Sequence, residues 1–522
     1  MRPPVRRFRP PLALLPLALA AGCAPNRPGA RPLLADAPPP VMREFRGVWV
    51  ASVANIDWPS RPGVPADSAR IELVGMLDRA VALGLNAVIL QVRPAADALY
   101  PSELEPWSEY LTGEQGRAPD PLWDPLEVAV AEAHRRGLEL HAWFNPYRAR
   151  HPSAKSPQAP THLSRTRPEL VKEYGRYLWM DPGEPAVQDH SIRVMLDVVR
   201  RYDVDGVHID DYFYPYPERD SAGRTVDFPD EPSWRRYVAS GGRLSRDDWR
   251  RRNVDEFVRR LYGEIKREKP WVKFGISPFG IWRPGYPPQI TTGFDQYAML
   301  YADARRWLRE GWMDYFTPQL YWPIAQTGQS YPVLLDWWVE ENVMGRHLWP
   351  GNFTSRTWEG NPTPWPASEV LGQIYVTRGR PGATGNVHFS IKAFWIDRDS
   401  LSERLAREAY REPALVPSSP WLSRARPGRP RATLVRDAAS GRLTVALEPG
   451  GGPAPFRWVV QSRAADRRWT TEVIPGWMRE HALPAGAEVV AVSAVDRLGN
   501  EGGRTVVVAG SGSREANPGA SR

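Results

Sequence analysis

Between Glu44 and Trp395 the chain alternates short apolar runs with stretches of helical periodicity, about eight times over. The apolar runs mix β-branched with aromatic residues and end in proline, glycine or polar residues, which is typical of buried strands. We therefore predict strands at residues 45–52, 85–93, 138–145, 204–210, 272–277, 313–321, 348–354 and 387–395.

The segments between these strands carry helix signals. An apolar stripe with a period of 3.6 residues runs from Ile71 to Val81. Asp124 followed by Pro125 is a typical helix N-terminus, with a capping side chain and proline in the first turn. Further helices are predicted from Asp189 and over 247–269.

Eight strand–helix units over roughly 350 residues predict a (β/α)₈ TIM barrel, which belongs to the α/β class. The alternative is a doubly wound open sheet. That fold calls for a glycine-rich phosphate-binding turn after an early strand, and Val92-Arg93-Pro94 does not resemble one. We assign residues 43–415 to the barrel.

A second domain is predicted after a break rich in proline, serine and arginine at residues 416–430, which we interpret as a linker. Beyond it the pattern is all-β, with candidate strands at 442–447, 456–462, 469–474 and 487–496. About 85 residues suit a small β-sandwich. We therefore predict a sandwich over 431–510 and a disordered tail over 511–522.

The N-terminus has the features of an export signal. Four arginines precede an apolar run at residues 11–20, which is too short to span a bilayer. Residues 20–23 (AAGC) resemble a bacterial lipobox, so we predict a lipoprotein signal peptide over 1–22 and lipidation of Cys23. A plain signal peptide cut near Gly22 is the alternative. Residues 23–42 are predicted to be a proline-rich tether.

This prediction sets the expected location and partners. Residue 24 is alanine rather than aspartate, so we expect lipid anchoring in the cell envelope, at the periplasmic face of the outer membrane. The chain of 522 residues has a formal net charge of +8, which falls to +4 once the four arginines of residues 1–22 are removed. The remaining arginines are scattered among acidic residues, so no nucleic-acid partner is expected.

Cofactor signals are missing from the sequence. The nine histidines are scattered with no His-x-x-x-His pair, and Cys23 is the only cysteine. No nucleotide-binding loop and no Gly-x-Ser-x-Gly nucleophile turn appears. We therefore expect neither a metal nor a cofactor.

Polar and aromatic side chains gather where the predicted strands end, which is where the active sites of such barrels lie. Aromatic faces stack on sugar rings, while amide, imidazole and cationic groups bind hydroxyls, so these ends predict a carbohydrate site. The candidate binding residues are Arg93, Trp143, Asn145, His208, Tyr212, Gln319, Tyr321, Trp322, Asn352 and Lys392.

The fourth strand end carries the candidate catalytic residues. Period-two alternation turns Val207 and Ile209 towards the helices, and therefore His208 and Asp210 towards the barrel axis. A buried carboxylate is costly unless it is used or paired, and glycoside hydrolysis needs two carboxyl groups. We predict Asp210 as nucleophile or charge stabiliser and Asp211 as the acid.

Two alternatives remain at this point. Asp210 could instead form a structural ion pair with Arg93, Arg148 or Lys392. The second carboxyl group could also come from a loop, in which case the candidates are Asp57, Asp303 and Glu359.

Several motifs resemble one family of barrel hydrolases. They are residues 44–50 (EFRGVWV), 55–59 (NIDWP), 181–183 (DPG), 208–215 (HIDDYFYP), 300–303 (LYAD) and 314–322 (DYFTPQLYW). Together they resemble the glycosyl-hydrolase-like 10 family over roughly residues 43–410. The resemblance implies a (β/α)₈ hydrolase of the bacterial envelope, often a lipoprotein, acting on peptidoglycan glycan strands that have lost their stem peptides. Residues 492–500 resemble the last strands of a fibronectin type III sandwich, a common appendage in such proteins.

Comparison with other barrel glycosidases leaves the acid unresolved. Residues 205–210 (DGVHID) resemble the α-amylase motif that ends in the nucleophile, but the fifth strand end, 274–278, carries no glutamate. Tyr212 stands where chitinases have their acid. A non-catalytic glycan-binding lipoprotein, or a hydrolase of another polysaccharide such as an α-glucan or exopolysaccharide, therefore remains an alternative.

Overall fold

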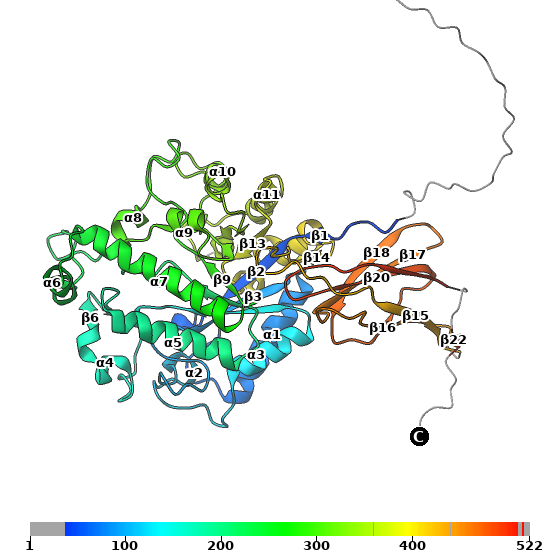
Figure 1. The fold of residues 1–522 in the computed structure, drawn as a ribbon, viewed down its shortest axis with the longest axis horizontal. Coiled ribbons are helices and arrows are strands. Elements are labelled where there is room, and N and C mark those ends of the chain that lie inside the picture. Colours follow the sequence, from blue (N-terminus) through cyan, green and yellow to red (C-terminus); the bar gives the residue numbers. More distant parts are fainter. Residues whose placement is uncertain (1–36, 359, 439, 510–513, 516–522) are drawn as a thin grey trace, which may run out of the picture. The chain divides into compact units, whose positions relative to one another are not determined.

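The computed structural model of the protein describes residues 37–358, 360–438, 440–509 and 514–515 (Figure 1). The predicted signal peptide over 1–22, the lipidation site Cys23, most of the tether and most of the tail over 511–522 lie outside the described residues. Glu359, one of the alternative carboxyl groups, also lies outside them.

The barrel strands are parallel and follow one another around a closed ring. In the described part of the chain they are β2 (Phe45–Val50), β3 (Ala87–Arg93), β4 (Glu139–Phe144), β8 (Gly206–Ile209), β9 (Lys273–Ile276), β10 (Tyr315–Phe316), β11 (His347–Leu348), β12 (Gly351–Asn352) and β13 (Gly385–His388). This arrangement confirms the predicted (β/α)₈ barrel.

The seventh barrel strand is split into β11 and β12, and it closes the ring. β11 pairs with β10, while β12 pairs with β13. The backbone N–H of Gly351 donates to Pro318 O at 2.9 Å, and the N–H of Val387 donates to Pro350 O at 3.0 Å, so the split strand bonds to both neighbours. Pro350 has no N–H to donate, which accounts for the interruption. A closed ring excludes the open doubly wound sheet.

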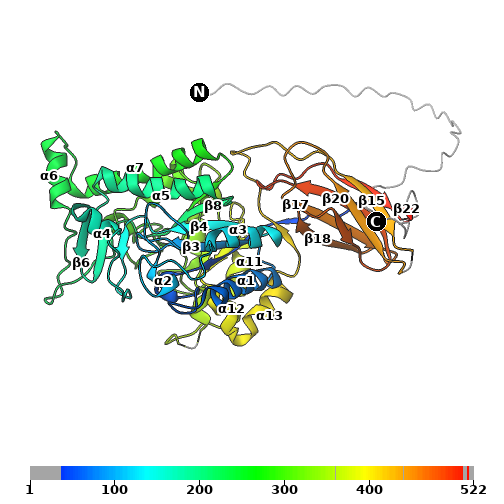
Figure 2. The same ribbon diagram turned by 90° about the horizontal axis from the view of Figure 1, so that it is seen from below.

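Helices surround the strands (Figures 1 and 2). The main ones are α1 (Ala66–Ala82), α3 (Pro125–Arg135), α5 (Pro185–Arg201), α7 (Arg246–Glu268), α9 (Ala304–Glu310), α10 (Tyr331–Glu341), α11 (Ala367–Arg378) and α12 (Lys392–Ile396). Asp124 caps α3 by accepting from the N–H groups of Leu126 and Glu127, as predicted. α5 begins at Pro185, before the predicted Asp189, because proline is preorganised for a first turn.

Shorter elements fill the connections. They are α2 (Glu109–Thr112), α4 (Leu163–Thr166), α6 (Glu231–Ala239), α8 (Gln296–Met299), α13 (Leu401–Arg404), β5 (Arg148–Arg150), β6 (Val171–Tyr174) and β7 (Tyr177–Met180). β1 (Met42–Arg43) pairs with β14 (Ala414–Leu415). None of the helices in the described segments is both long and apolar enough to cross a membrane.

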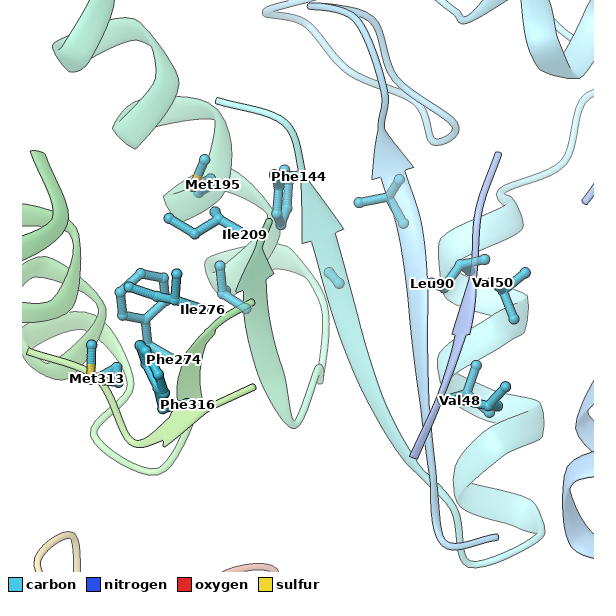
Figure 3. Close-up of a cluster of buried hydrophobic side chains, with 14 of the residues drawn as sticks. Val48, Val50, Leu90, Phe144, Met195, Ile209, Phe274, Ile276, Met313 and Phe316 are labelled. Carbon is cyan, nitrogen blue, oxygen red and sulfur yellow. The ribbon is translucent and has the colours of Figure 1, made fainter. Parts of the chain in front are cut away.

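Period-two alternation divides the barrel side chains into two sets. One set, which includes Val48, Leu90, Ile209 and Phe316, packs outwards with helix residues such as Met195 (Figure 3). The other set fills the barrel axis with Phe45, Trp49, Ile89, Trp143, Tyr315 and Trp349. The rings of Phe45 and Trp349 stack with their centroids 3.7 Å apart. The interior is therefore packed, and it leaves open space only at the strand ends.

The C-terminal part is a sandwich of two sheets whose strands pair antiparallel, except for one short edge strand. One sheet contains β15 (Arg431–Arg436), β16 (Leu443–Glu448) and β19 (Glu480–Ala482), and at its edge the short strand β22 (Arg514–Glu515) pairs with β15 in parallel. The other contains β17 (Arg457–Ala464), β18 (Trp469–Pro475), β20 (Ala487–Val495) and β21 (Thr505–Val508). Trp458 lies buried between them. This confirms the fibronectin type III-like character of the domain.

Candidate active site

A cavity of about 390 Å³ opens at the carboxyl ends of the barrel strands. Its walls are largely aromatic, and its polar lining includes two adjacent carboxyl groups. The aromatic residues are Trp49, Trp143, Tyr212, Tyr216, Phe279, Tyr321, Phe353 and Phe389, and the polar ones include Gln91, Arg148, His151, Asp210, Asp211, Ser277 and Gln319.

Asp210 and Asp211 both line this cavity and are both only 5% exposed. The sequence predicts a strand that continues to residue 210, which would turn neighbouring side chains to opposite faces. Instead β8 ends at Ile209, so the two aspartates belong to the following loop, where strand alternation no longer applies.

Asp210 is held by three N–H donors. The Asn145 Nδ2 group donates to both carboxylate oxygens, at 2.8 and 2.7 Å. The Trp143 indole Nε1 donates at 3.2 Å, and the backbone N–H of Tyr212 donates at 3.3 Å. Each of these groups can donate but not accept, so they favour the ionised form of Asp210.

A relay of amides fixes the orientation of Asn145. Gln91 Oε1 accepts from the backbone N–H groups of Ser52 and Val53, at 2.9 and 2.8 Å, so its Nε2 must be the group that faces Asn145. That Nε2 and Arg148 Nη2 each donate to Asn145 Oδ1 at 2.6 Å, which leaves Asn145 Nδ2 for Asp210. The sequence predicts a substrate-binding Asn145, whereas the structure places it behind Asp210.

Asp211 has different partners. The Tyr216 hydroxyl donates to Asp211 Oδ2, and the side-chain amide of Gln319 is a second partner. Gln319 also donates to the backbone oxygen of Ser277 at 2.9 Å, which fixes its position. A hydroxyl can reverse its role and accept, so a protonated Asp211 can keep its bond to Tyr216.

Burial governs the electrostatics of the pair. Burial, and then the charge of Asp211, raise the pKa of Asp210 to about 7, while Arg148 opposes this rise. Burial also raises the pKa of Asp211. Two carboxyl groups that interact this closely titrate together, so the pair holds one proton near neutral pH.

Several predicted binding residues lie outside the cavity lining. Arg93 is fully buried, and its Nε donates to Glu105 Oε2 at 2.7 Å, because the loop after β3 supplies a carboxylate for it. Asn352 donates to Gln373 at 2.8 Å within the barrel wall. Lys392 was predicted in a strand over 387–395, but β13 ends at His388 and Lys392 begins α12.

His208 and Trp322 support the cavity from outside it. His208 points to the axis as predicted, but it lies beneath the cavity, where Trp49 Nε1 donates to its Nε2 at 3.1 Å. Burial lowers the pKa of His208 well below its ordinary value, so this ring is neutral. Trp322 packs edge-on against Phe279, with 5.5 Å between the ring centroids.

Of the predicted binding residues, Trp143, Tyr212, Gln319 and Tyr321 line the cavity. The alternative carboxyl groups Asp57 and Asp303 do not. Asp57 accepts from Ser390 Oγ at 2.6 Å and from the Ala51 N–H at 2.8 Å. Asp303 caps α9 and accepts from the Trp282 indole at 3.1 Å.

Trp49 and Tyr216 line the cavity although neither was predicted as a site residue, and Arg148 was predicted only as an ion-pair partner. Tyr216 directly follows residues 208–215, which end the fourth predicted strand, and Arg148 comes three residues after Asn145. Their closeness in sequence to predicted site residues could have identified them. The described residues contain no group of three or more His, Cys, Asp or Glu side chains arranged to hold a metal ion.

Comparison with known proteins places the chain in a family. The glycosyl hydrolase-like 10 family matches residues 44–352. Glycosyl hydrolase YngK of Bacillus subtilis (strain 168) is 42% identical over 409 residues, which cover 77% of this chain and 78% of that protein. Glycosyl hydrolase DigH of Escherichia coli (strain K12) is 36% identical over 359 residues, which cover 64% of this chain and 80% of that protein.

Among solved structures, the glycoside hydrolase domain of PgaB (BpsB) from Bordetella bronchiseptica matches with a TM-score of 0.45 at 12% identity. The match covers 70% of this chain and 98% of that one. The family match and the identity to YngK decide the assignment. The chain belongs to the glycosyl hydrolase-like 10 family.

Proposed function

We propose that this glycoside hydrolase cuts the glycan strands of bacterial peptidoglycan after their stem peptides have been removed. The observation that carries the proposal is the buried pair Asp210 and Asp211 inside a cavity with aromatic walls. Aromatic walls suit sugar rings, and a carboxyl pair that shares one proton suits cleavage of a glycosidic bond.

The two aspartates have different hydrogen-bond partners, and we assign them different catalytic roles on that basis. Asp210 faces N–H groups only, so it stays ionised and stabilises positive charge on the sugar ring as the bond breaks. Asp211 keeps its hydroxyl partner Tyr216 when protonated, so it carries the shared proton and donates it to the leaving oxygen.

The low positive charge of the cavity supports a glycan that carries no stem peptides. Of the described residues, two basic side chains line it, Arg148 and His151. Burial, together with the nearby Arg148 and Arg176 charges, lowers the pKa of His151 to about 4, so that ring is neutral at physiological pH. Arg148 already donates to Asn145 and to Pro94 O. The walls therefore offer few partners for the carboxylates of stem peptides.

The predicted anchor completes the proposal. Lipidation at Cys23 and the tether that follows would hold the catalytic barrel at the periplasmic face of the outer membrane, within reach of the cell wall.

The test is the release of soluble fragments from purified glycan strands, with and without stem peptides. We expect fragments from the stripped strands only, and none from the Asp211→Asn variant. An α-glucan and an exopolysaccharide serve as alternative substrates, and cleavage of either in place of the stripped strands contradicts the proposal. Binding of stripped strands without fragment release indicates the non-catalytic glycan-binding alternative.

A further inference from the structure

In the described part of the chain, the cavity contains a carboxyl group that can act as the acid but no carboxylate placed to attack from the opposite side. In the common glycosidase mechanisms, one carboxyl group protonates the leaving oxygen while another, across the sugar ring, attacks or activates water. Asp210 and Asp211 are consecutive, with Cα atoms about 3.8 Å apart, and both follow the same strand. They therefore approach a sugar from one side.

No third carboxyl group among the described residues lines the cavity. Asp57 and Asp303 are both held in hydrogen bonds elsewhere, to Ser390 and at the N-terminus of α9. Among the groups that the described residues offer, the attacking group is then water or the substrate itself.

Tyr321 supplies a second observation. Its ring lines the cavity and stacks on Phe353, with 4.8 Å between the ring centroids. Its hydroxyl forms no hydrogen bond with any described residue. Burial, and then the charges of Asp211, Tyr212 and Asp210, raise the pKa of Tyr321 well above its ordinary value, so this hydroxyl is a neutral donor beside the carboxyl pair. This half-buried donor lines the cavity beside the acid without a protein partner, so it is free to donate to an oxygen of a bound ligand.

We propose that the attacking group is the 2-acetamido oxygen of the substrate, held between the Tyr321 hydroxyl and the Asp210 carboxylate. This inference rests on the proposed function, because both sugars of peptidoglycan glycan carry a 2-acetamido group. Tyr321 donates to the acetamido oxygen and aims it at the anomeric carbon. Asp210 accepts from the acetamido N–H and stabilises the positive charge that develops there.

The step balances as follows. The acetamido oxygen forms a bond to the anomeric carbon while the bond from that carbon to the glycosidic oxygen breaks. The released electron pair stays on the leaving oxygen, which takes the proton of Asp211. The sugar is left as a cyclic oxazolinium ion beside the Asp210 carboxylate. Water then attacks the anomeric carbon, gives a proton to Asp211 and reopens the ring, so the anomeric configuration is retained.

This mechanism defines the substrate class. Attack by the acetamido oxygen needs the leaving group on the opposite face of the ring, which makes the substrate a 1,2-trans glycoside of a 2-acetamido sugar. Sugars with a hydroxyl or a free amine at this carbon cannot form the ring, so an α-glucan is excluded.

The experiment compares stripped glycan strands in three forms: native, de-N-acetylated and then re-N-acetylated, and de-N-acetylated and then N-trifluoroacetylated. Fluorine withdraws electrons from the attacking oxygen without changing the shape of the glycan much. We expect the trifluoro form to be cut ~10² to 10³-fold more slowly than the native form, and the re-acetylated control to recover the native rate. Nuclear magnetic resonance of the first product should show a retained anomer.

The Tyr321→Phe variant tests the positioning donor. We expect kcat on native strands to fall ~10²-fold with little change in KM. The change from the native to the trifluoro form should slow the Tyr321→Phe variant less than it slows the wild type, because Tyr321 acts through the same oxygen.

Equal rates on the native and trifluoro forms, an inverted product, or a glycosyl adduct trapped on Asp210 or Asp211 by a 2-fluoro sugar would each overturn the inference while leaving the proposed function intact. If native strands are not cut at all, the proposed function fails, and this inference fails with it.

Discussion

A single nitrogen of Asn145 donates to both carboxylate oxygens of Asp210, at 2.8 and 2.7 Å. The two residues are held together by the pairing of β4 with β8, in which Phe144 lies opposite Ile209. The residue that follows each strand brings the amide to the carboxylate. Asn145 is thus the positioning residue of Asp210, and its own orientation depends on Gln91 and Arg148.

We expect Asn145→Ala to lower kcat/KM about 10²-fold, because the variant removes the donor that both stabilises and aims the Asp210 carboxylate. The lost donor should also raise the pKa of Asp210, so the acidic limb of the pH–rate profile should move to higher pH.

Arg148 would lose a partner as well, so far-ultraviolet circular dichroism is the control for folding. Asn352→Ala serves as a matched control, because Asn352 is equally buried but donates to Gln373 and not to Asp210. Similar losses in the two variants would count against a positioning role.

Asp211→Asn should lower kcat by about 10² to 10⁴-fold on strands with an unactivated leaving group. Activity of the wild type should fall at high pH as Asp211 loses its proton, and this basic limb should disappear in the variant. The measurement is kcat/KM across the pH range. A basic limb that persists in Asp211→Asn would mean that another group is the acid.

The raised pKa values of Asp210 and Asp211 link stability to pH. The carboxyl groups of the unfolded chain titrate near their ordinary pKa of about 4, whereas the folded pair keeps one proton until the pH reaches about 7. Between these values the folded protein holds a proton that the unfolded chain has released, so the free energy of unfolding falls as the pH rises through this window.

Asp210→Asn removes this titration. We therefore expect the stability of the variant relative to the wild type to improve by about 1–3 kcal/mol between pH 5 and pH 8. Urea denaturation at the two pH values measures the difference. Asp67→Asn, an exposed change in the first turn of α1 and remote from the cavity lining, is the control. A relative stability of Asp210→Asn that does not change with pH would show that the folded aspartate pair holds no proton in this pH window.

Cys23→Ser tests the anchor. If Cys23 carries the lipid, the variant should be released from the membrane fraction or remain unprocessed, since serine cannot form the thioether. Fractionation and the mass of the mature N-terminus distinguish these results. A processed variant that stays in the membrane fraction contradicts lipidation at this residue.

The sequence by itself determined what depends on local spacing. Period-two alternation placed His208 on the barrel axis, as its bonds to Tyr315 and Ser277 show. Asp124 before Pro125 fixed the start of α3. These features follow from backbone geometry within a few residues, which the order of apolar and polar side chains encodes directly.

The tertiary structure decided which strand-end side chains face the cavity. Arg93 pairs with Glu105, and Asn145 donates a hydrogen bond to Asp210, although both were predicted from the sequence to bind substrate. Lys392 does not line the cavity, because the last barrel strand ends at His388. Such outcomes depend on where a strand stops and on partners tens of residues away. Strand register and ring closure bring those partners together, and no local pattern records them.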